Sequence, residues 1–427
     1  MQTSIENIYK IFRQSTGIEI DTRKISAGKL FFCLKGENFN ANEFAEEALE
    51  KGAIKVIVDE ADFATDSRII LVDNVLKCMQ SLANFHRHKF NIPIIGITGT
   101  NGKTTTKELI ATVLSTKFKT HFTLGNLNNH IGVPLTLLSM PMDTEIAVVE
   151  MGANHPHEIS DLCKIAEPNF GIITNIGKAH LEGFGSLQGV INTKRELYDY
   201  IADHGKLIFA DDDNTLLLEV GKNLERVTYG KNKNADYQAQ LLSSEPFIEI
   251  LFQGDIIETN LLGNYNFTNV LAAIAIGSYF GINKDELKKA ISSYQPSNKR
   301  SQLLETAKNK IYLDAYNANP TSMRNAIESF ASINISPKIA IIGDMLELGN
   351  ESKAEHLEIV NLLNSTDFEN IIFVGPEFSS AAKDTKFPRF SNSQLASEYL
   401  SKINLQGKFI LVKGSRGICL EKTLEWL

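Results

Sequence analysis

The sequence of 427 residues contains few cysteines, no long apolar run and no excess of positive charge. Its four cysteines are far apart and form no Cys-x-x-Cys pair, which favours reduced thiols in the cytoplasm over a disulfide framework or a zinc site. Because no run of about 18 apolar residues is present, we expect no membrane span. The net charge of −8 disfavours a general nucleic-acid-binding protein, which needs a basic face. We therefore expect a soluble, cytoplasmic protein.

The length and composition predict a multidomain α/β protein. Hydrophobic residues make up 43% and charged residues 22% of the chain, enough for complete cores. Apolar strand-like runs alternate with helical stretches throughout, which is typical of sheets wrapped by helices. Breaks near Pro93 and Pro296 predict three domains: a small N-terminal α/β domain (1–90), a central P-loop domain with a parallel sheet (91–297) and a C-terminal Rossmann-like domain (298–427).

A nucleotide-binding motif stands at the start of the central region. An apolar run, 92–98, leads into Gly99-Thr100-Asn101-Gly102-Lys103-Thr104-Thr105, and a helical pattern follows from Lys107. Strand, glycine turn and helix together predict a cradle of backbone N–H groups for the phosphates of ATP or GTP. Lys103 is expected to reach the β- and γ-phosphates, and the Thr104 hydroxyl to hold Mg²⁺. A tight turn with a chance lysine is disfavoured, because both flanks carry the expected apolar pattern.

Three further residues are candidates for chemistry. Glu150 ends the strand-like run 146–149, at the sheet edge where α/β proteins bind ligands, so it is a candidate Mg²⁺ ligand. His180 follows another strand, but imidazole is an unusual Mg²⁺ ligand, and a lone loop histidine often serves only in hydrogen bonding. Lys194 lies in a predicted helix, 190–200, where an exposed lysine without a function is the simpler interpretation.

Several motifs together resemble the Mur peptide ligase family, and the resemblance covers nearly the whole chain. They are the phosphate loop 99–105, Glu150, His180, and Asn269 in the stretch 263–269. Further stretches favour the family member that adds D-alanyl-D-alanine to UDP-N-acetylmuramoyl-tripeptide. These stretches are 21–24 with 30–36, 125–136, 314–320 and 343–349.

The resemblance implies an assignment of roles to the three domains. The N-terminal domain would hold the UDP-sugar, the central domain ATP, and the C-terminal domain would bring the dipeptide and close over ATP. Thr104 and Glu150 would ligate one Mg²⁺ and His180 a second, with Lys194 carbamylated near the metal and Lys103, His180 and Lys194 as the catalytic set. Asn269, Arg300 and Asp314 would contact the nucleotide. The implied substrate contacts are Thr22, Arg23, Lys35, Asn126, Asn128, Asn129, Asn317 and Asn319.

The implied reaction is amide formation through an acyl phosphate, catalysed by a monomer. Two departures affect the transfer of roles: Asn40-Ala41-Asn42 stands where many relatives have Asp-Gly-His, and Tyr265 where many have histidine. Two alternatives stay open. One is a P-loop switch, for which the stretch 283–286 (Asn-Lys-Asp-Glu) is an imperfect guanine-reading motif. The other is a ligase with another substrate, such as another Mur member or a folylpolyglutamate synthase.

Overall fold

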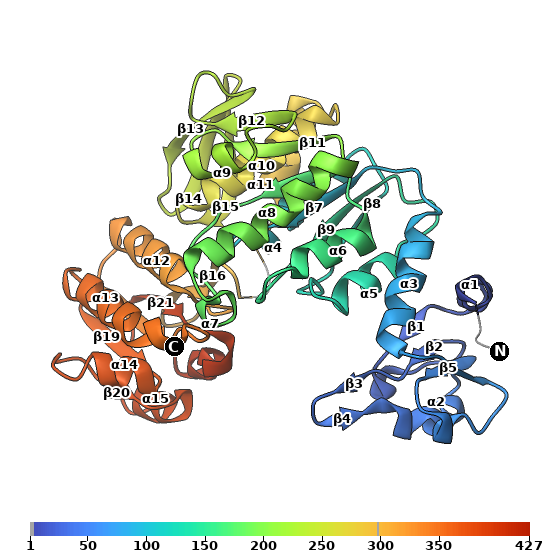
Figure 1. Ribbon diagram of the computed structural model, residues 1–427. Helices are drawn as coiled ribbons and strands as arrows, with labels where there is room; N and C mark the ends of the chain where they lie inside the picture. The colour runs from blue at the N-terminus through green and yellow to red at the C-terminus, as the bar shows by residue number, and fades with distance from the viewer. Residues whose placement is uncertain (1–3, 297–298) are drawn as a thin grey trace.

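The computed structural model describes residues 4–296 and 299–427, which form three α/β domains (Figure 1). The domains are built on sheets of four, nine and six strands in chain order. The central domain lies between the N-terminal domain (blue) and the C-terminal domain (orange to red). The expected boundary at 297–298 falls outside the described residues. Within the described ranges, no helix is long and apolar enough to cross a membrane.

The N-terminal domain is a parallel sheet in the order β1-β2-β5-β6, with a two-stranded hairpin, β3–β4, beside it. Helix α3 packs on α5 and α6 of the central domain, so it joins the two cores. The elements are α1 (Ile5–Gln14), β1 (Ile18–Glu19), β2 (Leu30–Phe32), β3 (Lys35–Gly36), β4 (Phe39–Asn40), α2 (Ala45–Glu50), β5 (Lys55–Val58), β6 (Ile69–Leu71) and α3 (Val75–Arg87). Single turns of 3₁₀ helix are η1 (Thr22–Lys24), η2 (Ala41–Phe44) and η3 (Ala61–Phe63).

The central sheet has the order β15-β14-β13-β12-β11-β10-β7-β9-β8. Helices α4, α10 and α11 pack on one face, and α5, α6 and α8 on the other. The strands are β7 (Ile94–Thr98), β8 (Thr120–Phe122), β9 (Ile146–Glu150), β10 (Phe170–Ile173), β11 (Leu207–Asp211), β12 (Arg226–Gly230), β13 (Tyr237–Ser243), β14 (Phe247–Phe252) and β15 (Asp255–Leu262). The helices are α4 (Lys103–Leu114), α5 (Gly132–Leu138), α6 (Glu158–Ala166), α7 (Leu181–Phe184), α8 (Leu187–His204), α9 (Thr215–Val220), α10 (Asn266–Tyr279) and α11 (Lys284–Ser293).

The sheet is parallel from β8 to β13, and the hairpin β14–β15, which the period-two pattern at 245–262 predicts, continues it antiparallel to β13. One detail of this domain differs from the sequence-based expectation. Helix α4 begins at Lys103 and not at Lys107, so the lysine and threonines of the phosphate loop form its first turn. That turn carries backbone N–H groups that have no partner inside the helix, which suits an anion site.

The C-terminal domain has a six-stranded sheet in the order β16-β17-β21-β18-β19-β20, parallel except for β16. Its continuous apolar strands are covered by helices on both faces, as expected for a doubly wound fold. The strands are β16 (Gln302–Glu305), β17 (Lys310–Asp314), β18 (Lys338–Gly343), β19 (Asn370–Val374), β20 (Arg389–Phe390) and β21 (Phe409–Lys413). The helices are α12 (Pro320–Ser332), η4 (Gly349–Glu351), α13 (Ser352–Asn364), α14 (Pro376–Ala381), α15 (Ser393–Leu400), η5 (Arg416–Ile418) and η6 (Leu420–Trp426).

Candidate active site

The phosphate loop runs between β7 and α4 and requires glycine at two positions. Gly99 has φ +143°, and a Cβ there would lie 2.1 Å from Thr174 Oγ1. Gly102 has φ +78°, and its Cβ would lie 2.6 Å from Asn269 Oδ1. The loop is also braced from β10, since Thr174 Oγ1 donates to the Asn101 carbonyl at 2.6 Å. The loop is therefore held in one shape before any ligand binds.

Lys103 folds over this loop. Its Nζ atom donates to the carbonyls of Gly99 at 2.6 Å and Thr100 at 3.0 Å. Burial lowers the pKa of Lys103 to about 8; Arg300 also lowers it, and Glu150 opposes both effects. A phosphate anion beside this amine would favour the protonated form of Lys103, and that ammonium would in turn attract the negatively charged triphosphate.

Buried Thr104 and Glu150 and half-buried Asn128 form a hydrogen-bonded group beside the loop. Glu150 Oε1 accepts from Thr104 Oγ1 at 3.2 Å and from Asn128 Nδ2 at 2.8 Å. Glu150 is only 1% exposed, and its Oε2 accepts no hydrogen bond from the described residues. A hydroxyl and a carboxylate oxygen that accepts no hydrogen bond are ligands that Mg²⁺ prefers, so these residues fit that ion, with the Lys107 ammonium 3.4 Å from the same oxygen.

His180 and Lys194 lie near this group but differ in setting. The Nδ1 atom of His180 contacts the Glu347 carboxylate of the C-terminal domain. Lys194 on α8 is 2% exposed, with Nζ 3.5 Å from the Ala153 carbonyl and 5.4 Å from the centre of the Phe184 ring. Burial lowers the pKa of Lys194 to about 7, and the charge of Lys103 adds to the effect. The interpretation of Lys194 as an exposed helix lysine is therefore wrong.

The expected nucleotide contacts come from two domains. Asn269 on α10 is buried and accepts from Thr106 Oγ1 at 3.0 Å. In the C-terminal domain, the Arg300 guanidinium lies 3.6 Å from the centre of the Tyr316 ring, and its buried Nε has no hydrogen-bond partner among the described residues. Asp314, at the end of β17, pairs with the buried Lys413 at 2.6 Å. These groups face one another across the domain boundary.

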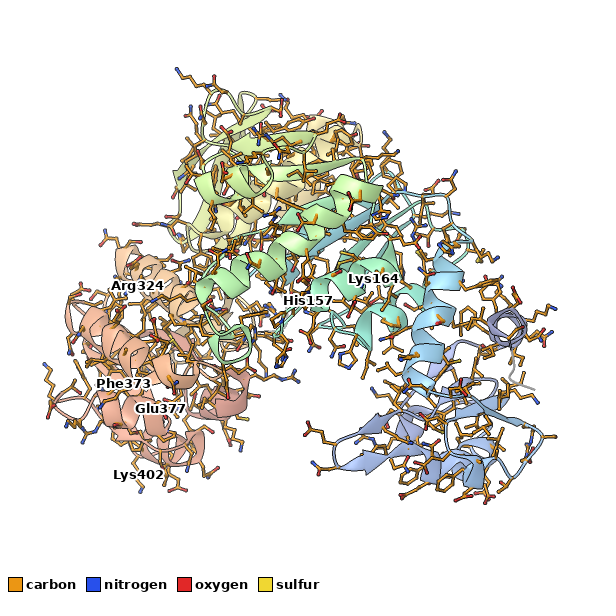
Figure 2. The ribbon with its side chains drawn as sticks, viewed as in Figure 1. His157, Lys164, Arg324, Phe373, Glu377 and Lys402 are labelled. Carbon is orange, nitrogen blue, oxygen red and sulfur yellow. The ribbon has the colours of Figure 1, made fainter. Side chains whose placement is uncertain are left out.

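A single cavity of about 740 Å³ brings most of the predicted site residues together. It reaches α6, near which Figure 2 labels His157, just before the helix, and Lys164, in its last turn; Lys164 is among the lining residues. Among the described residues, Gly99 and Lys194 are not in the lining, although Thr100, next to Gly99, and Ala153, which Lys194 contacts, are. The predicted residues that line the cavity are Thr100, Asn101, Gly102, Lys103, Thr104, Thr105, Asn126, Asn128, Asn129, Glu150, His180, Asn269, Arg300, Asp314, Asn317 and Asn319.

The predicted N-terminal contacts lie elsewhere. Arg23, on η1 beside Thr22, pairs with Asp21 at 2.8 Å and is exposed. Lys35 on β3 pairs with Asp59 at 3.0 Å and Glu60 at 2.7 Å. Within the described chain these three residues are not part of the cavity lining. Asn42, at the departure from the family pattern, is buried and donates to Asp59 Oδ1 at 2.9 Å.

Sequence reasoning missed residues that connect the site. Lys107 is fully buried beside Glu150, and its spacing from Ile110 and Leu114 places it on the apolar face of α4, which was the available signal. Tyr265 lines the cavity, and its hydroxyl contacts the Tyr312 hydroxyl and lies 3.0 Å from Ser301 Oγ. No local pattern could have found the contacts of Tyr265, because they join the central and C-terminal domains.

The imperfect guanine-reading motif has a structural role. Asn283 is the N-cap of α11, and its Oδ1 accepts from the Glu286 backbone N–H at 3.0 Å. The role of Asn283 as a helix cap accounts for an asparagine at this position, so no contact with a guanine base is needed to explain it.

Comparison with family models matches all three domains. Residues 14–87 match the Mur ligase family, catalytic domain; residues 97–277 the Mur ligase middle domain; and residues 299–416 the Mur ligase, glutamate ligase domain. The UDP-N-acetylmuramoyl-tripeptide--D-alanyl-D-alanine ligase of Bacillus subtilis is 36% identical, over 96% of this chain and 92% of that protein. The enzyme of the same name from Escherichia coli is 32% identical, over 96% and 93%.

Solved structures agree over the full length. A crystal structure of MurF from Acinetobacter baumannii is 29% identical, with a TM-score of 0.86 and 97% of each chain covered. That of MurF ligase from Thermotoga maritima in complex with ADP is 28% identical, with a TM-score of 0.84 and 97% of each chain covered. The three family models and the full-length relatives confirm the resemblance found in the sequence, and the chain belongs to the Mur ligase family.

Proposed function

We propose that this chain is an ATP-dependent ligase that joins D-alanyl-D-alanine to UDP-N-acetylmuramoyl-tripeptide and releases ADP and phosphate. The full-length similarity to curated ligases of that name supports this substrate pair over folylpolyglutamate or another Mur substrate. The observation that carries the proposal is one cavity lined by the phosphate loop, Glu150 and the asparagines of two domains. Such a cavity can bring the reacting ends of a nucleotide and two further substrates together.

The first stage is phosphoryl transfer to the tripeptide carboxylate. A carboxylate is a poor acyl donor because an oxide is a poor leaving group, whereas phosphate leaves readily. The N–H groups of residues 102–105 and the Lys103 ammonium would bind and orient the β- and γ-phosphates. Thr104 and Glu150 would hold Mg²⁺, which when bound supplies positive charge to the transferring phosphoryl group. Asn269, Arg300 and Asp314 would fix the rest of the nucleotide.

The second stage is attack by the dipeptide amine on the acyl phosphate, which forms an amide and expels phosphate. The developing oxyanion requires cationic or N–H groups, and Arg300 and Lys103 are the candidates on the cavity wall. Water would hydrolyse the acyl phosphate, so contacts between the central and C-terminal domains must form before the chemistry. The amide pair of Asn101 and Asn319, at 2.7 Å, is one such contact.

Residue roles outside the phosphate site belong to the same proposal. Residues 1–90, with Thr22, Arg23 and Lys35, would hold the UDP end, and residues 298–427 would present the dipeptide, with Asn317 and Asn319 on the cavity wall. Asn126, Asn128 and Asn129 would contact the sugar-peptide. His180 would be the ligand of a second Mg²⁺.

Lys194 is proposed to carry a carbamate. A carbamate forms when a neutral amine attacks CO₂, and a pKa of about 7 leaves much of this amine neutral near physiological pH. The modification would replace a buried cation by a carboxylate-like group close to the metal. Among the described residues its printed contacts are one carbonyl, that of Ala153, and the Phe184 ring, while the charges of Glu158 and Glu196 only partly oppose the lowering of the Lys194 pKa.

The proposed substrates and the free cysteines also indicate where the protein works. We infer a monomer that works in the cytoplasm on soluble nucleotide-linked precursors. All four cysteines are free, and two of them, Cys33 and Cys163, are buried, which suits a reducing compartment.

A substrate-omission assay tests the proposed function. Phosphate release from ATP is measured with both substrates, with each one alone, and with L-alanyl-L-alanine in place of the dipeptide. The proposal expects sustained release and a product of the summed mass only with the correct pair. Equal release without the dipeptide, or product from another acceptor at the same rate, would contradict it.

A further inference from the structure

Lys107 is a buried charged residue to which the proposed reaction gives no role. It lies in the second turn of α4 and is 0% exposed. Its Nζ atom is 3.4 Å from Glu150 Oε2, and that carboxylate is also buried. An ammonium is taken out of water only at high cost unless a carboxylate and further hydrogen bonds compensate it. The position of Lys107 is therefore tied to that of Glu150.

The same ammonium also holds the asparagine-containing loop that follows β8. Lys107 Nζ donates to the Gly125 carbonyl at 3.0 Å. From the other end of the loop, Asn128 donates Nδ2 to Glu150 Oε1 at 2.8 Å, and the Asn128 carbonyl accepts from the Gly152 N–H at 2.7 Å. Lys107 and Glu150 thus fix a loop whose Asn126, Asn128 and Asn129 line the cavity.

We propose that Lys107 is a positioning residue that couples the metal-side carboxylate Glu150 to the substrate-facing loop 125–129. This inference rests on the proposed function for the identity of the substrate. Lys107 is expected to have opposite effects on the affinities for the metal and for the sugar-peptide. The ammonium repels a divalent cation at Glu150, so it weakens metal binding. It also orders the loop, so it strengthens binding of the sugar-peptide.

The test compares Lys107→Met with Lys117→Met. Lys117 follows the same helix and also donates from Nζ to carbonyls, those of Phe280 at 3.1 Å and Gly281 at 2.9 Å, but it is not paired with Glu150. Binding of Mn²⁺ in the presence of ADP is measured by electron paramagnetic resonance, and KM is measured for each substrate. Lys107→Met is expected to bind Mn²⁺ about tenfold more tightly, because a repelling charge is removed. It is also expected to raise the KM for the sugar-peptide about tenfold, which corresponds to the loss of one charge-assisted hydrogen bond to the loop. Lys117→Met is expected to change neither.

A second variant guards against misfolding. Lys107→Gln removes the charge but keeps an N–H donor for Gly125, so it is expected to tighten Mn²⁺ binding with a smaller change in KM. The inference is overturned if the folded variants melt at lower temperature but keep the parent Mn²⁺ affinity and KM values, because Lys107 would then serve only stability. If the parent protein forms no amide, the proposed function fails, whereas the Mn²⁺ measurement still decides the role of Lys107.

Discussion

At the residue scale, the site depends on a few lysines whose charges are set by burial. Lys103 and Lys194 both have lowered pKa values, of about 8 and about 7, because they lose water on folding. Lys107 instead remains beside a carboxylate. We propose three tasks for these lysines: binding of phosphate for Lys103, reaction with CO₂ for Lys194, and positioning of the Glu150 carboxylate for Lys107.

Replacing Lys103 should stop the reaction without unfolding the protein. Lys103→Ala removes the cation expected at the transferring phosphoryl group, and we expect kcat to fall at least about 100-fold. The partners of Lys103 are carbonyls of its own loop, so the melting temperature should stay near that of the parent. Phosphate release and circular dichroism measure the two effects. A folded variant with near-parent turnover would contradict the assigned role.

The state of Lys194 should depend on pH and on CO₂. With a pKa of about 7, the amine is mostly neutral at pH 8 and mostly protonated at pH 6. Protein incubated with ¹³C-bicarbonate at pH 8 should show a carbamate carbon signal by NMR, weaker at pH 6 and absent from Lys194→Arg. An identical spectrum from the parent and the variant would exclude the carbamate.

The lowered pKa of Lys194 also affects stability. Between about pH 7 and the ordinary lysine pKa near 10.5, the unfolded chain binds a proton that the folded chain lacks, so this residue makes stability rise with pH in that window. Below pH 7 both states are protonated, and the full cost of burying the charge is present.

At the element scale, a helix cap connects the phosphate loop to the C-terminal domain. Asn319 caps α12 by accepting from the Ser322 N–H at 2.9 Å. It also donates to Asn101 of the phosphate loop at 2.7 Å. One side chain thus serves a helix end in one domain and the nucleotide loop of another.

Asn319→Ala should therefore have two effects where an ordinary cap has one. Loss of the cap is expected to cost about 1 kcal/mol of stability. Loss of the contact with Asn101 should also raise the KM for ATP. Asn392→Ala is the matched control, because Asn392 caps α15 through the Leu395 N–H at 3.0 Å and does not line the cavity. Equal KM values for the two variants, measured by phosphate release, would show that the contact with Asn101 has no effect on nucleotide binding.

The elements that the sequence predicts well are those with continuous apolar runs. Strands such as β9 and β18 are buried along their whole length, so composition alone marks them. The short edge strands β16 and β20 were not predicted, because they are only partly buried and owe their structure to a neighbour. The phosphate loop could be found because its chemistry is local, whereas Tyr265 and Lys107 act through partners distant in sequence.

At the scale of the whole molecule, the central and C-terminal domains are joined by polar contacts around the cavity. Lys178 pairs with Glu355 at 2.6 Å, and His180 contacts Glu347. The Lys178 side chain is 49% exposed, so a single pair contributes little to stability. Because the pair joins two domains, we expect it to affect their arrangement more than their stability.

Lys178→Met should loosen the contact between the central and C-terminal domains. We expect a larger radius of gyration by small-angle X-ray scattering in the presence of ADP, together with a lower kcat, because water would reach the acyl phosphate. Lys222→Met is the control, since Lys222 forms an ion pair of the same 2.6 Å length with Glu219 inside one domain. If both variants scatter and react like the parent, the Lys178–Glu355 pair does not govern closure.

The most direct test of the account follows the oxygen of the activated carboxylate. UDP-N-acetylmuramoyl-tripeptide labelled with ¹⁸O in the terminal carboxylate is converted with ATP and D-alanyl-D-alanine, and the released phosphate is analysed by mass spectrometry. The account predicts that one ¹⁸O atom passes from the tripeptide to each phosphate as the amide forms. Amide formation with unlabelled phosphate would contradict activation of the carboxylate by phosphoryl transfer.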